Sequence, residues 1–262
     1  MQRLQLVSLG GIMTGGTTKP VNIIALDENK NPCRYIMKVF TEKNIAQSVS
    51  VAKEILCSEL AKQFDLICPS YGIINFDHQE FVDLYDEQKL KSLDKGFKFC
   101  SKFVEQNAIF NPLLTNSFLK NYEVATIFAF DLFVYNVDRG GAHNKPNLLI
   151  NDSSLVLIDH ELTFPFIDNN NQVVDYEMFL GNYQFQKHVL IKHLKSLRTK
   201  EGIFDEFLEM LKHLNINDLN VIFDQMDNFD IPYIERQKFI HYFAWAKNNV
   251  VIFERYLRGM IR

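Results

Sequence analysis

The hydrophobic pattern changes abruptly along the chain, and this change limits the folds that the sequence can adopt. In the first 40 residues, short apolar runs alternate with turns: LQLVSL, VNIIALDE and CRYIMKVF surround a glycine-rich segment and an Asn-Lys-Asn-Pro turn. Apolar runs of this length between glycine and proline clusters predict β-strands. From Asn44 to Leu66 the apolar residues recur at helical spacing and stop before Pro69, which predicts one long amphipathic helix.

Helices are expected to dominate the rest of the chain. After one more predicted strand, YGIINF, a polar stretch at residues 76–84 precedes a series of apolar and amphipathic segments. The segment SFLKNYEVATIFAFDLFVYNV predicts a buried helix, PNLLIND and SLVLIDH predict a hairpin, and a long helix is expected from about Tyr233 to the C-terminus. We therefore predict an α+β fold, with residues 1–80 in a small β-rich lobe and 81–262 in a larger helical lobe of the same domain.

The composition is that of a packed globule. Apolar residues make up 47% of the 262 residues and aromatic residues 13%, which excludes an intrinsically disordered chain. The formal net charge is −4 and the isoelectric point is near 6.0, so the overall charge gives no reason to expect binding to nucleic acid or to an anionic membrane.

The sequence favours the cytoplasm as the location of the chain. Its four cysteines are widely spaced, without a Cys-x-x-Cys pair, and are expected to be reduced thiols. The N-terminus lacks the apolar core of a signal peptide, and no segment approaches the roughly 20 apolar residues of a membrane span.

The most informative polar residues lie in NVDRGGAHNKPNLLI and in LVLIDHE. Asp138 follows the buried helix, Asn147 begins the predicted hairpin nine residues later, and Asp159 stands at the far end of that hairpin. We expect the three side chains to converge on one point. Phosphoryl transfer needs such a set, since a carboxylate orients the attacking hydroxyl and Asn and Asp oxygens bind the magnesium that bridges the phosphates. Each of these residues alone would be better explained by a structural role, so the prediction depends on their occurring together in this order.

A second set of candidates lies upstream. Lys38 ends the strand IMKVF, where its ammonium group can contact the α and β phosphates of a nucleotide. A helix carboxylate must then orient it, and the candidates are Glu54 and Glu59. Glu54 is preferred because it begins the apolar face of the predicted helix, and Glu59 remains the alternative.

The glycine-rich segment GGIMTGG lies between the first two predicted strands. Its glycines would let backbone N–H groups approach nucleotide phosphates, with threonine hydroxyls as further donors. The segment lacks both the Gly-Lys-Ser/Thr of a P-loop and the G-x-G-x-x-G pattern. The candidate nucleotide-binding residues are Gly11, Gly15, Gly16, Thr17 and Lys38.

In their order, these motifs resemble those of the HipA-like kinases, especially the stand-alone kinase domains of that family. The resemblance covers residues 5–165 and includes IMKVF, KEILCSELAKQFDLICP, N-V-D-R, N-K-P-N-L-L-I and L-V-L-I-D-H, with Asp-His in place of Asp-Phe-Gly. It implies a two-lobed protein-kinase-like fold and an ATP- and magnesium-dependent kinase that phosphorylates Ser or Thr on a protein, and on itself as well. Some members are toxins of toxin-antitoxin modules, so an antitoxin or regulatory partner is a further expectation.

The resemblance also implies a role for each candidate residue. Asp138 would be the catalytic carboxylate, Lys38 the phosphate-binding lysine, Glu54 its partner, Asn147 and Asp159 the magnesium ligands, Asn144 an alternative ligand, and Arg139 a support of the catalytic loop. The alternative arises because Gly-Gly-Ala-His lengthens the spacing between Asp138 and the following Asn residues. His143 and His160 are expected to be structural, since phosphoryl transfer relies mainly on positioning and electrostatics.

Two alternative functions remain open from the sequence. A small-molecule or lipid kinase would use the same Asp-Asn-Asp set, although no basic amphipathic face indicates a membrane substrate. A catalytically silent pseudokinase would act as a binding module, but all of Lys38, Asp138, Asn147 and Asp159 are present. The apolar C-terminal segment around Trp245 is expected to be the packed side of a core helix.

Overall fold

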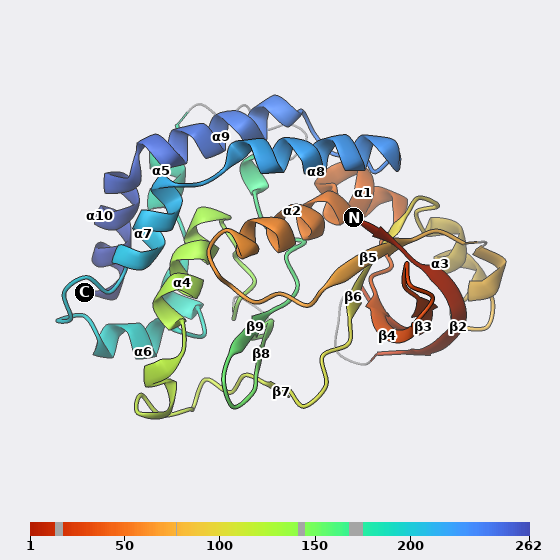
Figure 1. Cartoon of the computed structure of the whole chain (residues 1–262), viewed down its shortest axis with the longest axis horizontal. Helices are drawn as coiled ribbons and strands as arrows, with labels where there is room; N and C mark the ends of the chain where they lie inside the picture. The colour runs from red at the N-terminus through yellow and green to blue at the C-terminus, as the bar shows by residue number, and fades with distance from the viewer. Residues whose placement is uncertain (14–17, 77, 141–144, 168–174) are drawn as a thin grey trace.

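A computed structural model describes residues 1–13, 18–76, 78–140, 145–167 and 175–262 of the chain. The candidate residues Thr14, Gly15, Gly16, Thr17, His143 and Asn144 lie outside these ranges. Figure 1 shows a curled sheet formed by the N-terminal part and a group of helices formed by the C-terminal part. The predicted α+β fold, with a β-rich N-terminal part and a larger helical C-terminal part, is confirmed.

Six strands form the N-terminal sheet, in the order β1-β5-β6-β4-β3-β2. The strands are β1 (Gln2–Arg3), β2 (Gln5–Ile12), β3 (Val21–Leu26), β4 (Pro32–Met37), β5 (Tyr71–Ile74) and β6 (Lys98–Lys102). All neighbouring strands are antiparallel except β1 and β5. In β3, Val21, Ile23 and Ala25 are buried while the residues between them are not, which is the alternation expected of a sheet with one face against a core.

Strand β6 was not predicted from the sequence. It pairs with β4 and β5, so the N-terminal sheet extends to Lys102, beyond the boundary drawn between residues 80 and 81. A division that follows the sheet would fall after Lys102. The division into two lobes itself remains a prediction.

The single long helix predicted from Asn44 to Leu66 is wrong, because two helices occupy this segment: α1 (Glu42–Ser48) and α2 (Ser50–Lys62). Val49 between them has a left-handed backbone with φ 42°, which ends the regular hydrogen-bonding pattern of α1. Helix α2 is buried around most of its circumference, because it packs against β6 on one side and against α8 (Ile216–Asn228) on the other.

The C-terminal part is built around α4 (Val124–Phe133), in which nine of ten residues are buried. Further helices of this part are α5 (Tyr176–Gly181), α6 (Ile191–Ser196), α7 (Asp205–Lys212), α9 (Arg236–Asn248) and α10 (Val250–Ile261), while α3 (Glu87–Ser92) precedes β6 of the N-terminal sheet. Short 3-10 helices lie at His78–Phe81, Phe118–Asn121, Pro165–Ile167 and Phe185–Lys187. The long C-terminal helix predicted from Tyr233 is therefore two helices, α9 and α10, which meet at Asn249. Trp245 packs against Tyr176 and Phe253, as expected for a core-facing residue.

A small second sheet, β7-β8-β9, carries part of the candidate site. The strands are β7 (Ala108–Ile109), β8 (Leu148–Ile150) and β9 (Leu155–Leu157). The predicted hairpin is confirmed, since β8 and β9 pair antiparallel. The Asn151 side chain closes the turn by accepting hydrogen bonds from the backbone N–H groups of Ser153 and Ser154 at 2.9 and 2.8 Å, as Asn does in tight turns.

All four cysteines are free thiols. Among the described residues, none of the helices combines the length and the apolar character needed to cross a membrane.

Candidate active site

The Lys38 side chain lies at the centre of the site and is buried. Its ammonium group forms an ion pair with Glu54 of α2, and it donates a hydrogen bond of 2.6 Å to Asp159. Burial alone would lower the pKa of Lys38, but the carboxylates of Asp159 and Glu54 outweigh burial and raise it. Burial would likewise raise the pKa of Glu54, but Lys38 holds it down at about 2. Both groups are therefore charged at neutral pH.

The structure separates the two candidate partners of Lys38. Glu59, five residues further along α2, accepts a hydrogen bond of 2.8 Å from the hydroxyl of Tyr71 and pairs with Lys62. Glu54 also accepts a hydrogen bond of 2.9 Å from the backbone N–H of His160. The ion pair of Lys38 is thus made with Glu54, while Glu59 belongs to a different set of contacts.

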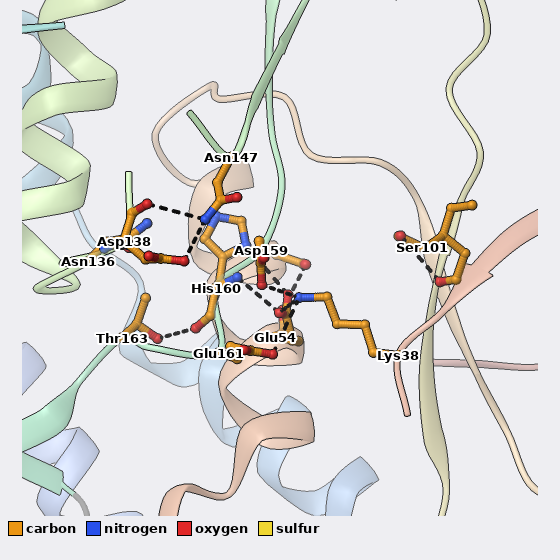
Figure 2. Close-up of polar contacts among 12 residues, drawn as sticks. Lys38, Glu54, Ser101, Asn136, Asp138, Asn147, Asp159, His160, Glu161 and Thr163 are labelled. Atoms are coloured by element: carbon orange, nitrogen blue, oxygen red, sulfur yellow. Dashed lines mark hydrogen bonds and ion pairs between the residues drawn. The ribbon is translucent and has the colours of Figure 1, made fainter. Parts of the chain in front are cut away.

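Asp138 and Asn147 both lie in the loop between α4 and β8, and their side chains are in contact. The Asn147 side-chain NH₂ donates to Asp138 Oδ2 at 2.8 Å and to the Asp138 carbonyl at 3.3 Å. Because the NH₂ group is used in this way, the amide oxygen of Asn147 is left to act as an acceptor or a cation ligand. Asn147 and Asp159 both have left-handed backbones, with φ of 45° and 65°. Figure 2 shows Asp138, Asn147, Asp159 and Lys38 pointing toward one another.

The chain was compared with known proteins. A family model described as HipA-like kinase matches residues 11–229, which is well over half of the chain. The chain belongs to the HipA-like kinase family. Among solved structures, the proinflammatory kinase CtkA of Helicobacter pylori aligns with 98% of this HipA-like chain and 91% of its own, at 12% identity and a TM-score of 0.46. No curated protein matches the chain.

The family membership confirms the resemblance seen in the motifs. The α+β architecture, with its curled sheet and helical part, is consistent with a kinase. A kinase of this kind implies ATP as a substrate. The roles of the individual residues remain predictions that the geometry supports.

In this HipA-like kinase, Arg139 lies beneath the site rather than in it. Its side chain is fully buried and forms a salt bridge with Asp131 of α4, and its guanidinium group also donates to the Asn147 carbonyl. Leu190 N–H donates to Nδ1 of His188 at 3.2 Å, so the Nε2–H of His188 is the donor to Asp131 at 3.0 Å. Burial would raise the pKa of Asp131, but Arg139 and then His188 lower it to about 2. This position agrees with the predicted role of Arg139 as a support of the loop.

Asp131 and His188 were missed by the sequence analysis. The available signal was a lone carboxylate inside an apolar helix, in VATIFAFDLF, since a charged residue at such a position is rarely buried without a partner. The distant partner His188, 57 positions along the chain, carries no comparable signal.

Glu161 was also missed, although it follows Asp159 by only two residues. Its side chain is 14% exposed, and its Oε2 lies 4.0 Å from the Lys38 ammonium. This oxygen is buried and has no hydrogen-bond partner among the residues that the structure describes. Burial raises the pKa of Glu161 to about 7, because the attraction of Lys38 is offset by the carboxylates of Asp159, Glu54 and Asp138.

His160 lies close to Glu54, and its predicted structural role remains a prediction. Its side chain is buried, and its carbonyl accepts a hydrogen bond of 2.7 Å from Thr163. Thr163 in turn accepts one of 3.3 Å from the thiol of Cys57. Together with the Glu54 contact, these bonds attach the segment after Asp159 to helix α2.

The glycine-rich segment is only partly described. Gly11 lies in β2, and an added side chain there would meet no atom within 4 Å. The N–H of Met13 donates to the carbonyl of Pro20 at 2.8 Å, which continues the β2–β3 hairpin toward the segment. The proposed phosphate contacts of Gly15, Gly16 and Thr17 lie outside the described residues.

Gly140, next to Arg139, is expected to tolerate no side chain. Its φ is +101°, and an added Cβ would lie 2.4 Å from the Lys187 carbonyl oxygen and 2.9 Å from the Val189 nitrogen. Both neighbours are backbone atoms and cannot turn away. We expect Gly140→Ala to lower the free energy of unfolding by about 2 kcal/mol or more, from strain and steric overlap, as measured by chemical denaturation.

A control for this substitution is available in helix α10. Around Gly259 an added Cβ meets no atom within 4 Å, so Gly259→Ala should leave stability unchanged or raise it by up to about 1 kcal/mol. Equal effects of the two substitutions would contradict the account of Gly140.

Proposed function

We propose that this HipA-like kinase transfers the γ-phosphate of ATP, with magnesium, to a Ser or Thr hydroxyl of a protein. The observation that carries the proposal is the convergence of Asp138, Asn147 and Asp159 with the Lys38–Glu54 ion pair (Figure 2). Phosphoryl transfer depends mainly on positioning and on charge compensation, and this set supplies both.

Asp138 would orient the attacking hydroxyl. One of its carboxylate oxygens, Oδ2, is held by the Asn147 amide at 2.8 Å. This bond fixes the rotation of the carboxylate and leaves the other oxygen to accept the hydrogen bond of the substrate hydroxyl. This second oxygen would also receive the proton of the hydroxyl as the phosphate ester bond forms.

Lys38 would bind the phosphates of ATP. The raised pKa keeps its ammonium group charged, and the Glu54 ion pair fixes its direction. Its second contact, the 2.6 Å bond to Asp159, is the one that nucleotide phosphates would compete for.

The donor set fits a magnesium ion. Asp159 offers a carboxylate that is 29% exposed, and Asn147 offers an amide oxygen that its own NH₂ contacts with Asp138 leave free to bind a cation. Oxygen donors of this kind are those that magnesium prefers. When bound, magnesium would supply compensation of the negative charge on the phosphates.

The family resemblance supports the remaining parts of the proposal. It favours a protein substrate and an antitoxin or regulatory partner, while the four free thiols favour a cytoplasmic location. Autophosphorylation would fall on Ser8, Thr14, Thr17 or Thr18, beside the phosphates, where an added charge of about −1.5 to −2 would inhibit ATP binding.

Thermal stability offers a first test of the proposal. Ligand at one hundred times its dissociation constant adds about 2.7 kcal/mol to the stability, which corresponds to about 5 to 10 °C for a chain of this size. We expect ATP with magnesium to raise the melting temperature by this amount, and Asp159→Ala to remove the part that requires magnesium. Labelled γ-phosphate on Ser or Thr of a cytosolic protein fraction would then identify the acceptor.

Two results would contradict the proposal. Binding of ATP with magnesium but no transfer to any protein would favour the pseudokinase, and transfer to a small alcohol alone would favour a small-molecule kinase.

A further inference from the structure

Glu161 lies in the site but has no part in the transfer as proposed above. Its side chain is 14% exposed and its Oε2 lies 4.0 Å from the Lys38 ammonium, which is too far for a hydrogen bond. Within the described part of the chain, this buried oxygen accepts no hydrogen bond. A buried carboxylate oxygen is costly unless a cation or a donor faces it, so the position of Glu161 calls for a partner that the described residues do not supply.

The charges around Glu161 point to a missing cation. Oxygen atoms of Glu54, Asp159 and Glu161 lie within 4.8 Å of one another. Among the described residues, the one ammonium group that faces all three is that of Lys38. Three carboxyl groups of the described residues thus share one ammonium group, and a divalent cation would balance the excess negative charge.

The described residues compensate the charge of Glu54, whereas they compensate the charges of Asp159 and Glu161 only in part. Glu54 forms the ion pair with Lys38 and accepts the 2.9 Å bond from the His160 N–H, and its side chain is 2% exposed. Among the described residues, the bond of Asp159 is to Lys38, and its side chain is 29% exposed, so a hydrated ion can reach it. The cation would therefore lie on the side of Asp159 and Glu161.

We propose that Glu161 binds the divalent cation of the site together with Asp159. The inference rests on the proposed function for the presence of a cation, and it adds a ligand that neither the motifs nor the family resemblance assigned. Magnesium keeps several water molecules and uses one or two protein carboxylates, so Asp159 and Glu161 suffice to bind it before the nucleotide arrives. Lys38 then remains paired with Glu54 and is available to the phosphates.

Binding of Mn²⁺ alone to the full chain, without nucleotide, tests this role. Mn²⁺ accepts the same oxygen ligands as magnesium, and its paramagnetic resonance signal measures free and bound ion directly. We expect wild-type protein to bind Mn²⁺ and to melt at a higher temperature in its presence. Glu161→Gln should weaken Mn²⁺ binding by at least about tenfold. Glu161→Asp, which keeps the charge on a shorter side chain, should fall between the two.

The stability without metal separates a cation ligand from a structural residue. Glu161→Gln removes one of the clustered negative charges, so its melting temperature without metal should equal or exceed that of wild type, while its shift with Mn²⁺ disappears. A structural partner of Lys38 would behave in the opposite way, with a lower melting temperature without metal. Glu59→Gln is the matched control, since Glu59 is similarly buried, at 20% exposed, but lies outside the cluster.

The outcomes also separate this inference from the proposed function. Unchanged Mn²⁺ affinity in Glu161→Gln would overturn the inference, and so would the absence of Mn²⁺ binding to a wild-type protein that transfers phosphate. Mn²⁺ binding that depends on Glu161, in a protein that transfers phosphate to no alcohol, would support the cation site and overturn the proposed function alone.

Discussion

Asp138→Asn is expected to reduce phosphoryl transfer by about 10³- to 10⁴-fold, because the substitution removes the carboxylate that orients the hydroxyl and accepts its proton. The shape of the side chain is kept, and the remaining carbonyl oxygen can still accept the hydrogen bond from Asn147. The melting-temperature shift with ATP and magnesium should therefore persist. The measurement is the initial rate of transfer under saturating ATP, together with the thermal shift of the same preparation.

The matched control for Asp138 is Asp152→Asn in the exposed turn of the β8–β9 hairpin. Asp152 lies beyond the far end of β8, the strand that begins directly after Asn147. The substitution removes the same charge there, and the variant should be as active as the wild-type protein. An Asp138→Asn protein that keeps more than about a tenth of the wild-type rate would show that another group orients the hydroxyl, since general bases contribute about 10²-fold or more.

The convergence of the candidate residues could be predicted from the sequence better than the contacts that surround them. Lys38, Glu54, Asp138, Asn147 and Asp159 could be found because each follows or begins an apolar element, and the order of those elements sets where their side chains meet. The choice between Glu54 and Glu59 depended on the face of helix α2, and that face can be read from helical spacing.

The contacts that hold the site together could not be predicted in the same way. Glu161 is close to Asp159 in sequence, but whether a donor of the described residues reaches its buried oxygen is visible only in the three-dimensional arrangement. His188 contacts Asp131 from a segment 57 positions away. The sequence around either residue does not indicate that the two side chains are in contact.

The predicted helix boundaries are wrong where the backbone conformation interrupts a helix that the hydrophobic pattern would continue. The apolar spacing continues through Val49 and through Asn249, so a single helix was expected at each place. The chain instead adopts a left-handed residue at Val49, and the polar Asn249 separates α9 from α10. Strand β6 was missed because its residues are buried on both sides in KFC, and a short buried run does not alternate.

Asp131→Ala is expected to be the most destabilising of the substitutions considered, with a loss of about 3 to 5 kcal/mol in the free energy of unfolding. The substitution leaves the guanidinium group of Arg139 without its carboxylate, and both side chains are 0% exposed. Equilibrium unfolding in urea measures the loss. Because Arg139 also holds the carbonyl of Asn147, the activity of the folded fraction should fall as well.

An exposed ion pair provides the control for Asp131. Lys91 and Glu87 form a salt bridge with 74% and 82% of their side chains exposed, so Glu87→Gln should change stability by less than about 1 kcal/mol. If Asp131→Ala were equally mild, the buried pair would not be the support of the catalytic loop.

The loss of stability in acid should follow from Asp131 and its partner His188. The pKa of Asp131 is lowered to about 2, below its ordinary value of about 3.9, so its stabilising effect is complete above that ordinary value and is lost as the pH falls toward 2. Burial also lowers the pKa of His188, which adds a loss that begins as the pH falls below its ordinary value of about 6.5. We therefore expect the melting temperature to decrease in two stages on acidification. In His188→Gln the stage that begins near pH 6.5 should be reduced, while in Asp131→Ala the stage below pH 4 should be reduced, because each variant lacks the group whose protonation drives it.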